Sequence, residues 1–351
     1  MARPHIEPFC DRDVHFKNMV LPGFGRGFSY KMLSFDNETG ACSMTVQYPA
    51  GYRQTPGFSW SEFEMIVIEG EMKVGDAIRR KGHYFFVPAG YAMPEITSDN
   101  GCLVLMMFNT GEPSHEESTN HHAQAQIDLF HSTDSYMDIP WSGGSVVSPS
   151  VATGCLIKLL NFNPISHAMT FLYCMTPNFY QDNISYHDCA EESYHLWGTS
   201  WMMQFGDIPS GGYFWRPAYI NHGAFASEYG CIALGRTDSK LFNHFHYNPW
   251  STPVQNQDRS GARLLKRDPL LYKWAVSKDH NHPHGPEDFE DTMILRGDEQ
   301  GHDIAEHKSD GRRHDHWHGH SHHHPDSEHC HDHHHGDGHH HGDGHHHHDH
   351  D

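Results

Sequence analysis

Two stretches of the sequence repeat one pattern: GHYFFVPAGYAM at residues 82–93 and GGYFWRPAYINH at residues 211–222. Gly, Tyr, Phe and Pro recur at the same places in both, at one offset of 129 (211 minus 82). The match continues without a gap into PEITSDNGCLVL at 94–105 and GAFASEYGCIAL at 223–234. Self-similarity at one fixed offset is the signature of a duplicated structural unit. The sequence therefore predicts two copies of one domain.

A second matching segment lies upstream of each copy. It reads EMIVIEGEMKV at residues 64–74 and ESYHLWGTSWM at residues 192–202, at an offset of 128 (192 minus 64). A one-residue difference in a connecting loop accounts for the change of offset. Each unit thus contains an apolar strand reaching a glycine, an aromatic strand ending at Pro, and a strand beginning at Gly-Cys. Short strands separated by turns at this density predict an all-β fold of small barrels or sandwiches.

Composition and charge narrow the classes of protein further. The formal net charge of -21 argues against a nucleic-acid partner, because nucleic-acid binding needs a basic surface. No stretch reaches the roughly 18 apolar residues of a membrane span, and the N-terminal residues lack the apolar core of a secretion signal. The eight cysteines are scattered, with no C-x-x-C pair. We expect a cytoplasmic protein with reduced thiols and neither a nucleic-acid nor a membrane partner.

The two repeated segments resemble the two short motifs of the cupin superfamily. The first of these motifs runs H-x-H, three or four residues, Glu, six residues, Gly, and the second ends in P-x-G-x-x-H. The resemblance covers roughly residues 40–112 and 170–246, and it implies a bicupin, two jelly-roll β-barrels in tandem. The expected organisation is a first barrel at 1–112, a connector at 113–150, a second barrel at 151–260, a partly helical extension at 261–300 and a disordered tail at 301–351.

The second unit retains most of the side chains of these motifs. Six residues separate Glu191 from Gly198, and three separate His187 from Glu191. Four residues separate Pro217 from His222, which takes the place of the second motif's histidine. The resemblance implies that His187, Glu191 and His222 converge inside the second barrel. Two histidines and one carboxylate form a set that binds Fe(II) with open coordination positions. We expect one divalent ion there, with Fe(II) favoured and Ni, Mn, Zn and Cu as alternatives.

The second unit departs from the motif at Ser185, where a cupin has its first histidine. Three protein ligands then remain, unless His195, His244 or His246 completes the set. His244 and His246 lie on one face of the strand predicted at FNHFHYN, residues 242–248. They could bind the metal, line the entrance or have a structural role.

The first unit has lost the motif's ligands. Its four corresponding positions hold Gly57, Ser59, Phe63 and Met93. Glu62 and Glu64 flank the lost glutamate, and strand alternation directs them to the opposite side of the sheet. We therefore interpret the first barrel as structural, dimer-forming or substrate-shaping, which makes a homodimer one expected assembly.

Four further residues of the second unit are candidates for the chemistry. His195 follows Glu191 by four residues on one strand, so alternation points both side chains inward. It could carry a proton or be a hydrogen-bonded structural histidine. Tyr213, Trp215 and Arg216 precede His222 and could bind a substrate or fill the barrel. Arg216 could clamp a carboxylate or form a surface ion pair.

The C-terminal part has a different composition. GARLLKRDPLLYKWAV at 261–276 has apolar residues at helical spacing and predicts a helix. Residues 302–351 contain more than half of the 38 histidines and little to bury, which predicts disorder. Imidazole is a preferred ligand of Ni, Zn and Cu, so this tail could gather additional ions or be a passive solvated segment.

These features favour a metal-dependent enzyme acting on a small-molecule substrate. An open-sided ion inside a barrel can bind a substrate's oxygens and act as a Lewis acid or activate oxygen. Among the cupin reactions, which include those of dioxygenases, lyases and isomerases, we expect an oxygenase. Two alternatives remain from other classes: a metal-storage or metal-sensing protein that works through its tail, and a non-catalytic bicupin that binds a small ligand.

Overall fold

The computed structural model describes residues 3–20, 24–143, 154–246, 248, 266, 269 and 270. Residues 1–256 form one compact unit. The predicted helix at 261–276 lies mostly outside the described residues, although the three described there have helical conformation. The histidine-rich tail lies wholly outside them. No helix in the described ranges is long and apolar enough to cross a membrane.

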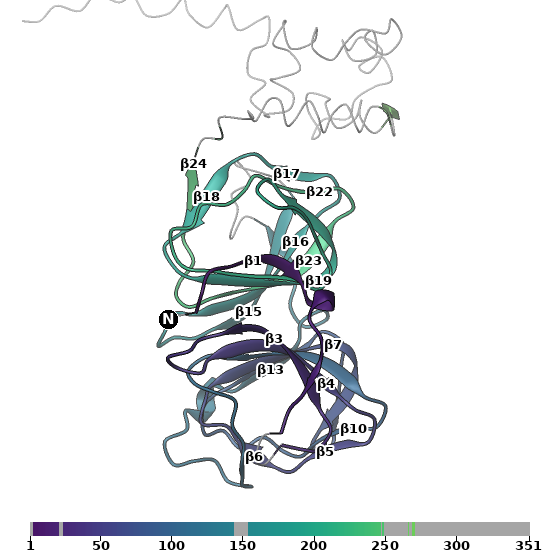
Figure 1. The fold of residues 1–351 in the computed structure, drawn as a ribbon, viewed down its shortest axis with the longest axis vertical. Helices are drawn as coiled ribbons and strands as arrows, with labels where there is room; N and C mark the ends of the chain where they lie inside the picture. The colour runs from purple at the N-terminus through teal and green to yellow at the C-terminus, as the bar shows by residue number, and fades with distance from the viewer. Residues whose placement is uncertain are drawn as a thin grey trace, which may run out of the picture. The chain divides into compact units, whose positions relative to one another are not determined.

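The described structure is all-β and is dominated by two ten-stranded antiparallel sheets, as the sequence predicts (Figure 1). The first sheet has the central order β13-β9-β7-β11-β4-β3-β2. Its strands are β2 (Lys17–Asn18), β3 (Ser29–Phe35), β4 (Cys42–Tyr48), β5 (Tyr52–Gln54), β7 (Phe63–Val74), β8 (Ala77–Arg80), β9 (His83–Val87), β10 (Ile96–Ser98), β11 (Cys102–Phe108) and β13 (His131–Asp134).

The second sheet repeats this plan with the central order β1-β21-β19-β23-β16-β15-β14. Its strands are β1 (Ile6–Cys10), β14 (Ser142–Gly143), β15 (Cys155–Phe162), β16 (Met169–Met175), β17 (Phe179–Gln181), β19 (Glu191–Met202), β20 (Gly206–Pro209), β21 (Gly212–Arg216), β22 (Phe225–Ser227) and β23 (Cys231–Thr237). Two small sheets add β6 (Gly57–Phe58) with β12 (Glu116–Glu117), and β18 (Ile184–His187) with β24 (Asn243–His246).

The repeated glycines mark equivalent positions in the two barrels. Gly70 pairs with Cys102, and Gly198 pairs with Cys231. Both glycines have positive φ, 77° and 76°, a backbone conformation that residues with a side chain rarely adopt. A Cβ at Gly198 would also lie 2.2 Å from the Gly230 carbonyl oxygen. The backbone of the paired strand lies so close to these glycines that a side chain would not fit. Glycine therefore lets the long strands β7 and β19 turn there while they stay paired.

The N-terminal strand belongs to the second barrel. β1, at the start of the chain, pairs with β21 of the second barrel, whereas β13, which precedes the second barrel, pairs with β9 of the first. Figure 1 shows the purple N-terminal strand β1 among the teal strands of the second barrel. The residue ranges expected from the sequence put residues 6–10 in the first barrel, because strand pairing between distant segments leaves no local pattern.

An apolar layer joins the outer faces of the two sheets. It includes Ile66 and Tyr84 from the first barrel and Tyr194 and Trp215 from the second. The interiors of the barrels hold separate cores, so each sheet buries side chains on both faces. This explains why β7 and β9 read as nearly continuous apolar runs rather than as alternating strands.

Two buried glutamates lie within this layer at equivalent positions. The carboxylate of Glu64 accepts hydrogen bonds from Tyr84, at 2.5 Å, and from Thr170 of the second barrel. The carboxylate of Glu192 accepts from Tyr213, at 2.6 Å, and from a serine of the first barrel, Ser43, at 2.7 Å. Each carboxylate thus accepts hydrogen bonds from both barrels, and Glu64 accepts a further one from Asn109, at 3.1 Å.

Arginine side chains balance these buried charges. Arg236 forms ion pairs with both Glu64 and Glu192, and Arg3 lies 3.6 Å from the Glu192 carboxylate. Burial alone would raise the pKa of Glu192, but the charges of Arg236 and Arg3 outweigh burial and hold this pKa below its usual range. The interface therefore contains ionised groups that depend on one another.

Replacing Arg236 with Met should strongly destabilise the fold. Methionine is the residue at the equivalent position of the first barrel, Met107, but the change would leave two buried carboxylates without their shared cation. We expect a loss of about 3–5 kcal/mol in the free energy of unfolding, measured by urea titration. The control Arg80→Met removes an exposed ion pair with Glu71 and should cost less than about 1 kcal/mol. Equal losses in the two variants would contradict this account of the interface.

Candidate metal centre

Three separate segments of the second barrel position the metal-binding candidates. His187 is the last residue of β18 and Glu191 is the first of β19. His222 lies in the loop between β21 and β22, and two backbone hydrogen bonds of 2.8 Å join it to Ser185 on β18. This bridge places His222 beside the strand that carries His187, so motif residues far apart in the sequence meet at one point.

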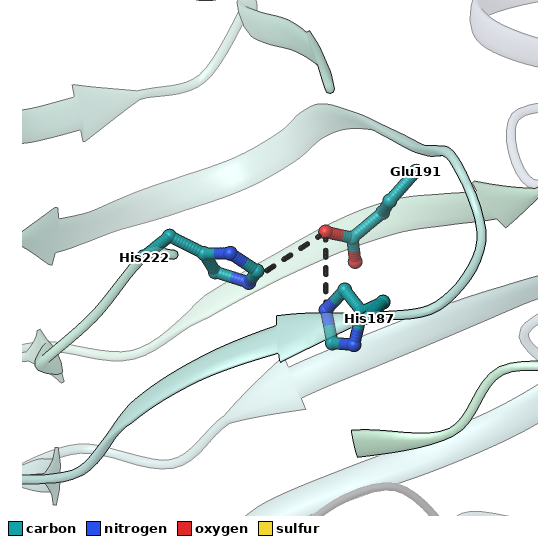
Figure 2. Close-up of side chains that lie close together, drawn as sticks. All are labelled: His187, Glu191 and His222. Atoms are coloured by element: carbon teal, nitrogen blue, oxygen red, sulfur yellow. Dashed lines mark ion pairs between the residues drawn. The ribbon is translucent and has the colours of Figure 1, made fainter. Parts of the chain in front are cut away.

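The structure brings His187, Glu191 and His222 together, with ligand atoms that all lie within 4.8 Å of one another. Glu191 Oε2 lies 3.5 Å from His187 Nε2 and 3.9 Å from His222 Nε2. Figure 2 shows both imidazoles directed toward the carboxylate. The side chains of His187, Glu191 and His222 are 8, 13 and 5% exposed, so little water reaches them. In the described part of the chain, this is the one group of three or more such residues with that geometry.

The outer nitrogens of the two rings are held by backbone carbonyls. His222 Nδ1 lies 2.8 Å from the carbonyl oxygen of Ile220, and His187 Nδ1 lies 3.4 Å from that of Phe242. A carbonyl can only accept, which assigns the ring proton to Nδ1 in each histidine. In a neutral ring Nε2 then presents a lone pair toward Glu191. Carbonyl partners of this kind orient metal-binding histidines.

The pKa values agree with these roles. Burial raises the pKa of Glu191, but the neighbouring His187, His222 and Arg216 outweigh it and lower this pKa to about 2. Burial lowers the pKa of His222 to about 4, despite the nearby Glu191 charge. At neutral pH the glutamate is therefore ionised and His222 is neutral, the states that metal ligands require.

These residues fit a divalent cation. Two imidazole lone pairs and a carboxylate oxygen face one another, an arrangement that is repulsive unless a positive charge lies among them. The pKa of His187 is raised, because the charge and hydrogen bond of Glu191 outweigh the opposing effect of burial, so a proton on His187 can supply that charge. A divalent ion would supply it more fully, and two histidines with one carboxylate leave further coordination positions open.

A pocket of about 70 Å³ adjoins the three residues. Its walls come mainly from the second ten-stranded sheet and the β18–β24 pair, and aromatic rings dominate them: Phe171, Phe179, Phe214, Phe225 and Phe245. The polar residues among its walls, apart from the three metal-binding candidates, are Tyr173, Gln181, Ser185 and Asn243. Ser185 thus lies at the pocket where the motif's first histidine would be.

His195 does not line this pocket. It is 1% exposed, and its Nε2 lies 2.8 Å from Ser200 Oγ. Alternation does direct His195 and Glu191 to the same face, but four residues at roughly 3.3 Å each place them about 13 Å apart along the strand. Burial lowers the pKa of His195 to about 4. His195 is therefore a buried, hydrogen-bonded histidine outside the pocket.

The aromatic strand β21 contributes different residues from those proposed for substrate binding. Tyr213 and Trp215 face the other barrel and belong to the apolar layer between the sheets. Phe214, between them, lines the pocket. The Arg216 guanidinium lies over the Phe214 ring, 4.2 Å from its centroid, and reaches Glu7 at 3.4 Å. Tyr213, Trp215 and Arg216, which were predicted to bind a substrate, therefore do not line the pocket, whereas Phe214 does.

His244 and His246 also lie outside the pocket. Their rings stack on Tyr186, with centroids 4.7 and 5.1 Å away, and both residues are exposed. Asn243 and Phe245 occupy the other face of the same strand and line the pocket. The prediction that His244 and His246 share a face holds, but that face is the outer one, so they do not complete the ligand set.

Sequence reasoning missed the phenylalanines and the two buried or half-buried amides, Gln181 and Asn243. The available signal for them was strand alternation. It puts Phe214 on the same face as Arg216, and Asn243 on the same face as Phe245. It does not say which group faces inward. Gln181 stands on the three-residue strand β17, which has no recognisable pattern of its own.

In the first barrel, apolar side chains pack at the positions that correspond to the metal-binding candidates of the second. Phe63 and Met93 belong to its interior core, as the loss of the motif suggests. A Cβ at Gly57 would lie 2.3 Å from Cε1 of His115, so the imidazole of a connector residue occupies the space beside this glycine. Glu64 faces the second barrel, the outward direction predicted for it.

Comparison with known proteins places these features in a family. The family described as "Domain of unknown function (DUF4437)" matches residues 20–244. No curated protein matches the sequence. A solved structure described as a "putative dioxygenase" from Nostoc punctiforme has a TM-score of 0.65 and 19% identity, covering 70% of this chain and 92% of that one.

Two further solved structures are more distant. Oxalate decarboxylase from Bacillus subtilis has a TM-score of 0.45 and 11% identity, and covers 68% of this chain and 78% of its own. The protein Ylba from E. coli has a TM-score of 0.45 and 12% identity, covering 67% of this chain and 91% of its own. The first structure, with its higher score, shows that the fold of the chain is shared with known proteins.

Replacing Glu191 with Gln should remove one tightly bound ion from the full-length chain. The amide keeps the shape of the side chain but loses the charge that balances a cation. The histidine-rich tail is the same in both proteins, so the difference between them reports the barrel site alone. We expect a Co(II) affinity at least about tenfold weaker at that site, measured by competition with a chromophoric chelator. Equal binding by both proteins would show that the ion is held elsewhere.

The barrel site should lose affinity as the pH falls. Because the pKa of His187 is raised above its usual value, protons compete with the ion there first, whereas His222, with a pKa of about 4, stays available. We expect a roughly tenfold loss of Co(II) affinity per pH unit between about 6.5 and 5. The measurement is a titration at several pH values with the Glu191→Gln protein subtracted. A flat profile would show that His187 is not a ligand.

Proposed function

The chain belongs to the DUF4437 family, and we propose that it is a metal-dependent oxygenase acting on a small organic substrate in its second barrel. The observation that carries this proposal is the group formed by His187, Glu191 and His222 at the wall of an apolar pocket. Lone pairs and a carboxylate converge there in surroundings that exclude bulk water. A cation site with open positions beside a substrate-sized space is what oxygen activation needs.

The ligand set favours Fe(II) as the resident ion. Two histidines and one carboxylate form the facial arrangement of non-haem iron oxygenases. Ni, Mn, Zn and Cu remain alternatives, since imidazole and carboxylate bind each of them. The solved structure with the same fold, described as a "putative dioxygenase", supports the choice of reaction class.

Each of the three residues would have its own role at the metal site. When bound, the ion would polarise a substrate oxygen and bind dioxygen. His187 and His222 would hold it through Nε2, while the carbonyls of Phe242 and Ile220 fix both rings. Glu191 supplies the balancing charge and stays ionised because its pKa is about 2.

Other pocket residues would position the substrate and keep the site dry. Ser185 is small where a fourth protein ligand would otherwise stand, so it leaves a coordination position to the substrate or to dioxygen. The surrounding phenylalanines would exclude water, which strengthens electrostatic interactions at the site. Tyr173, held by a 2.8 Å hydrogen bond to Ser193, keeps its proton because burial raises its pKa well above the usual range.

Binding of nitric oxide, a stand-in for dioxygen, tests the proposal without a known substrate. The full-length protein loaded anaerobically with Fe(II) should give the electron paramagnetic resonance signal of an iron–nitrosyl adduct, and Glu191→Ala should lose at least about nine-tenths of it. His244→Ala is the matched control: it removes an exposed histidine that stacks on Tyr186, and should retain the signal. An adduct of equal size in Glu191→Ala would place the iron in the tail and refute the barrel oxygenase.

Oxygen consumption is then measured with a panel of small aromatic and aliphatic molecules whose oxygen atoms can bind a metal ion. This measurement identifies the reaction class. An oxygenase consumes dioxygen in step with the loss of substrate. Turnover that proceeds equally well without dioxygen would instead show a lyase or isomerase at the same site.

A further inference from the structure

The walls of the second-barrel pocket carry information about the substrate. Five phenylalanines surround the space beside His187, Glu191 and His222, together with other apolar side chains such as Ile157 and Met175. Apart from the three metal-binding candidates, the polar wall residues are neutral: one tyrosine, one glutamine, one serine and one asparagine. Neither lysine nor arginine belongs to the described lining. The body of a bound molecule would therefore meet rings and aliphatic groups.

A buried cation, Arg216, lies near this space but does not line it. Arg216 is 2% exposed and pairs with Glu191 across neighbouring strands. Its guanidinium lies against the Phe214 ring, and its Nη2 donates to Glu7 on β1 and to the sulfur of Met202. Phe214, rather than Arg216, lines the pocket. A carboxylate on the body of a substrate would consequently be buried among aromatic rings without a cationic partner in the lining, which is costly.

The charges around the site call for one anionic group at the ion. A divalent cation held by Glu191 and two neutral histidines keeps one uncompensated positive charge. The opposite charges of Arg216 and Glu7 offset each other nearby. One ionised oxygen donor on the substrate would complete the balance, whereas a second anionic group would exceed it.

The pocket is also small. Its volume is about 70 Å³, on a scale where one water needs roughly 10–15 Å³. The space therefore holds a molecule about the size of several waters, such as one carrying a single ring. Edge-to-face contacts with the walls would favour an aromatic ring, and Phe225 already meets His222 in that way, with centroids 5.6 Å apart.

We infer that the second barrel takes a small molecule with an uncharged, preferably aromatic body and one ionisable oxygen donor directed at the metal, and that it discriminates against molecules with a further carboxylate. This inference rests on the proposed function, because the ion anchors the substrate. Phenols with an adjacent oxygen, and enols of similar size, belong to this class.

A pair of probes tests the inference. Catechol and 3,4-dihydroxybenzoate present the same two adjacent oxygens, but the second carries an additional carboxylate. The full-length protein loaded with Co(II) is titrated anaerobically with each probe, and the change in the visible Co(II) spectrum is followed. Glu191→Ala, which retains the tail, is subtracted as background. We expect catechol to bind at least about tenfold more tightly, after correction for each probe's affinity for free Co(II).

Variants at the pocket wall sharpen the test. Phe245 pairs with Ser185 and is half-buried, so a long side chain there can reach the pocket from the edge of the barrel. Phe245→Arg should supply the missing cation and shift the preference toward 3,4-dihydroxybenzoate by about tenfold, whereas Phe245→Leu should keep the preference for catechol. Retention of the Co(II) spectrum in both variants shows that the site is intact.

The outcomes separate this inference from the function on which it rests. If the wild-type protein holds Co(II) in the barrel but binds 3,4-dihydroxybenzoate as tightly as catechol, or binds neither, the substrate class is wrong and the metal site stands. If the spectrum of the wild-type protein equals that of Glu191→Ala before any probe is added, the metal site itself is wrong.

Discussion

Strand alternation at the start of β19 is the constraint on which the rest of the structure depends. Glu191 and Glu192 are neighbours in the chain, but successive side chains of a strand point to opposite faces. Glu191 therefore enters the second barrel and joins the two histidines, whereas Glu192 enters the layer between the barrels. In the first barrel the equivalent pair is Phe63 and Glu64. The duplicated unit keeps the outward carboxylate in both copies and the inward one in the second alone.

These buried carboxylates are stabilised in different ways. Glu192 and Glu64 have permanent partners, since Arg236 lies between them and hydroxyl groups from both barrels donate to them. Glu191 faces imidazoles whose charge depends on protonation, so its surroundings are complete only with a proton or a cation. The first arrangement holds the two barrels together, and the second is suited to bind and release an ion.

The pairing of β1 with the second barrel links the stability of the fold to the site. β1 extends the sheet that contains Glu191, and its Glu7 holds the buried Arg216 beside that residue. Arg3, just before β1, bonds to Ser34 and Ser43 of the first barrel and approaches Glu192 of the second. The N-terminal segment thus contacts both barrels. The first barrel, with an apolar interior in place of the ligands, provides a surface against which the second barrel is held.

The sequence by itself determined the duplication, the all-β class and the three residues that meet at the candidate metal centre. The three residues came from the resemblance to the cupin motifs, which can be read from the sequence because each motif is local: His187 and Glu191 flank one turn, and His222 follows one strand by a fixed number of residues. Only the tertiary structure decided which residues form the pocket. Alternation tells which side chains share a face, but the inner face of a barrel is set by how the sheet curves and by which neighbour covers its outside. For this reason Phe214 and Phe245 line the pocket, while Trp215 packs between the barrels and His244 stacks on the surface.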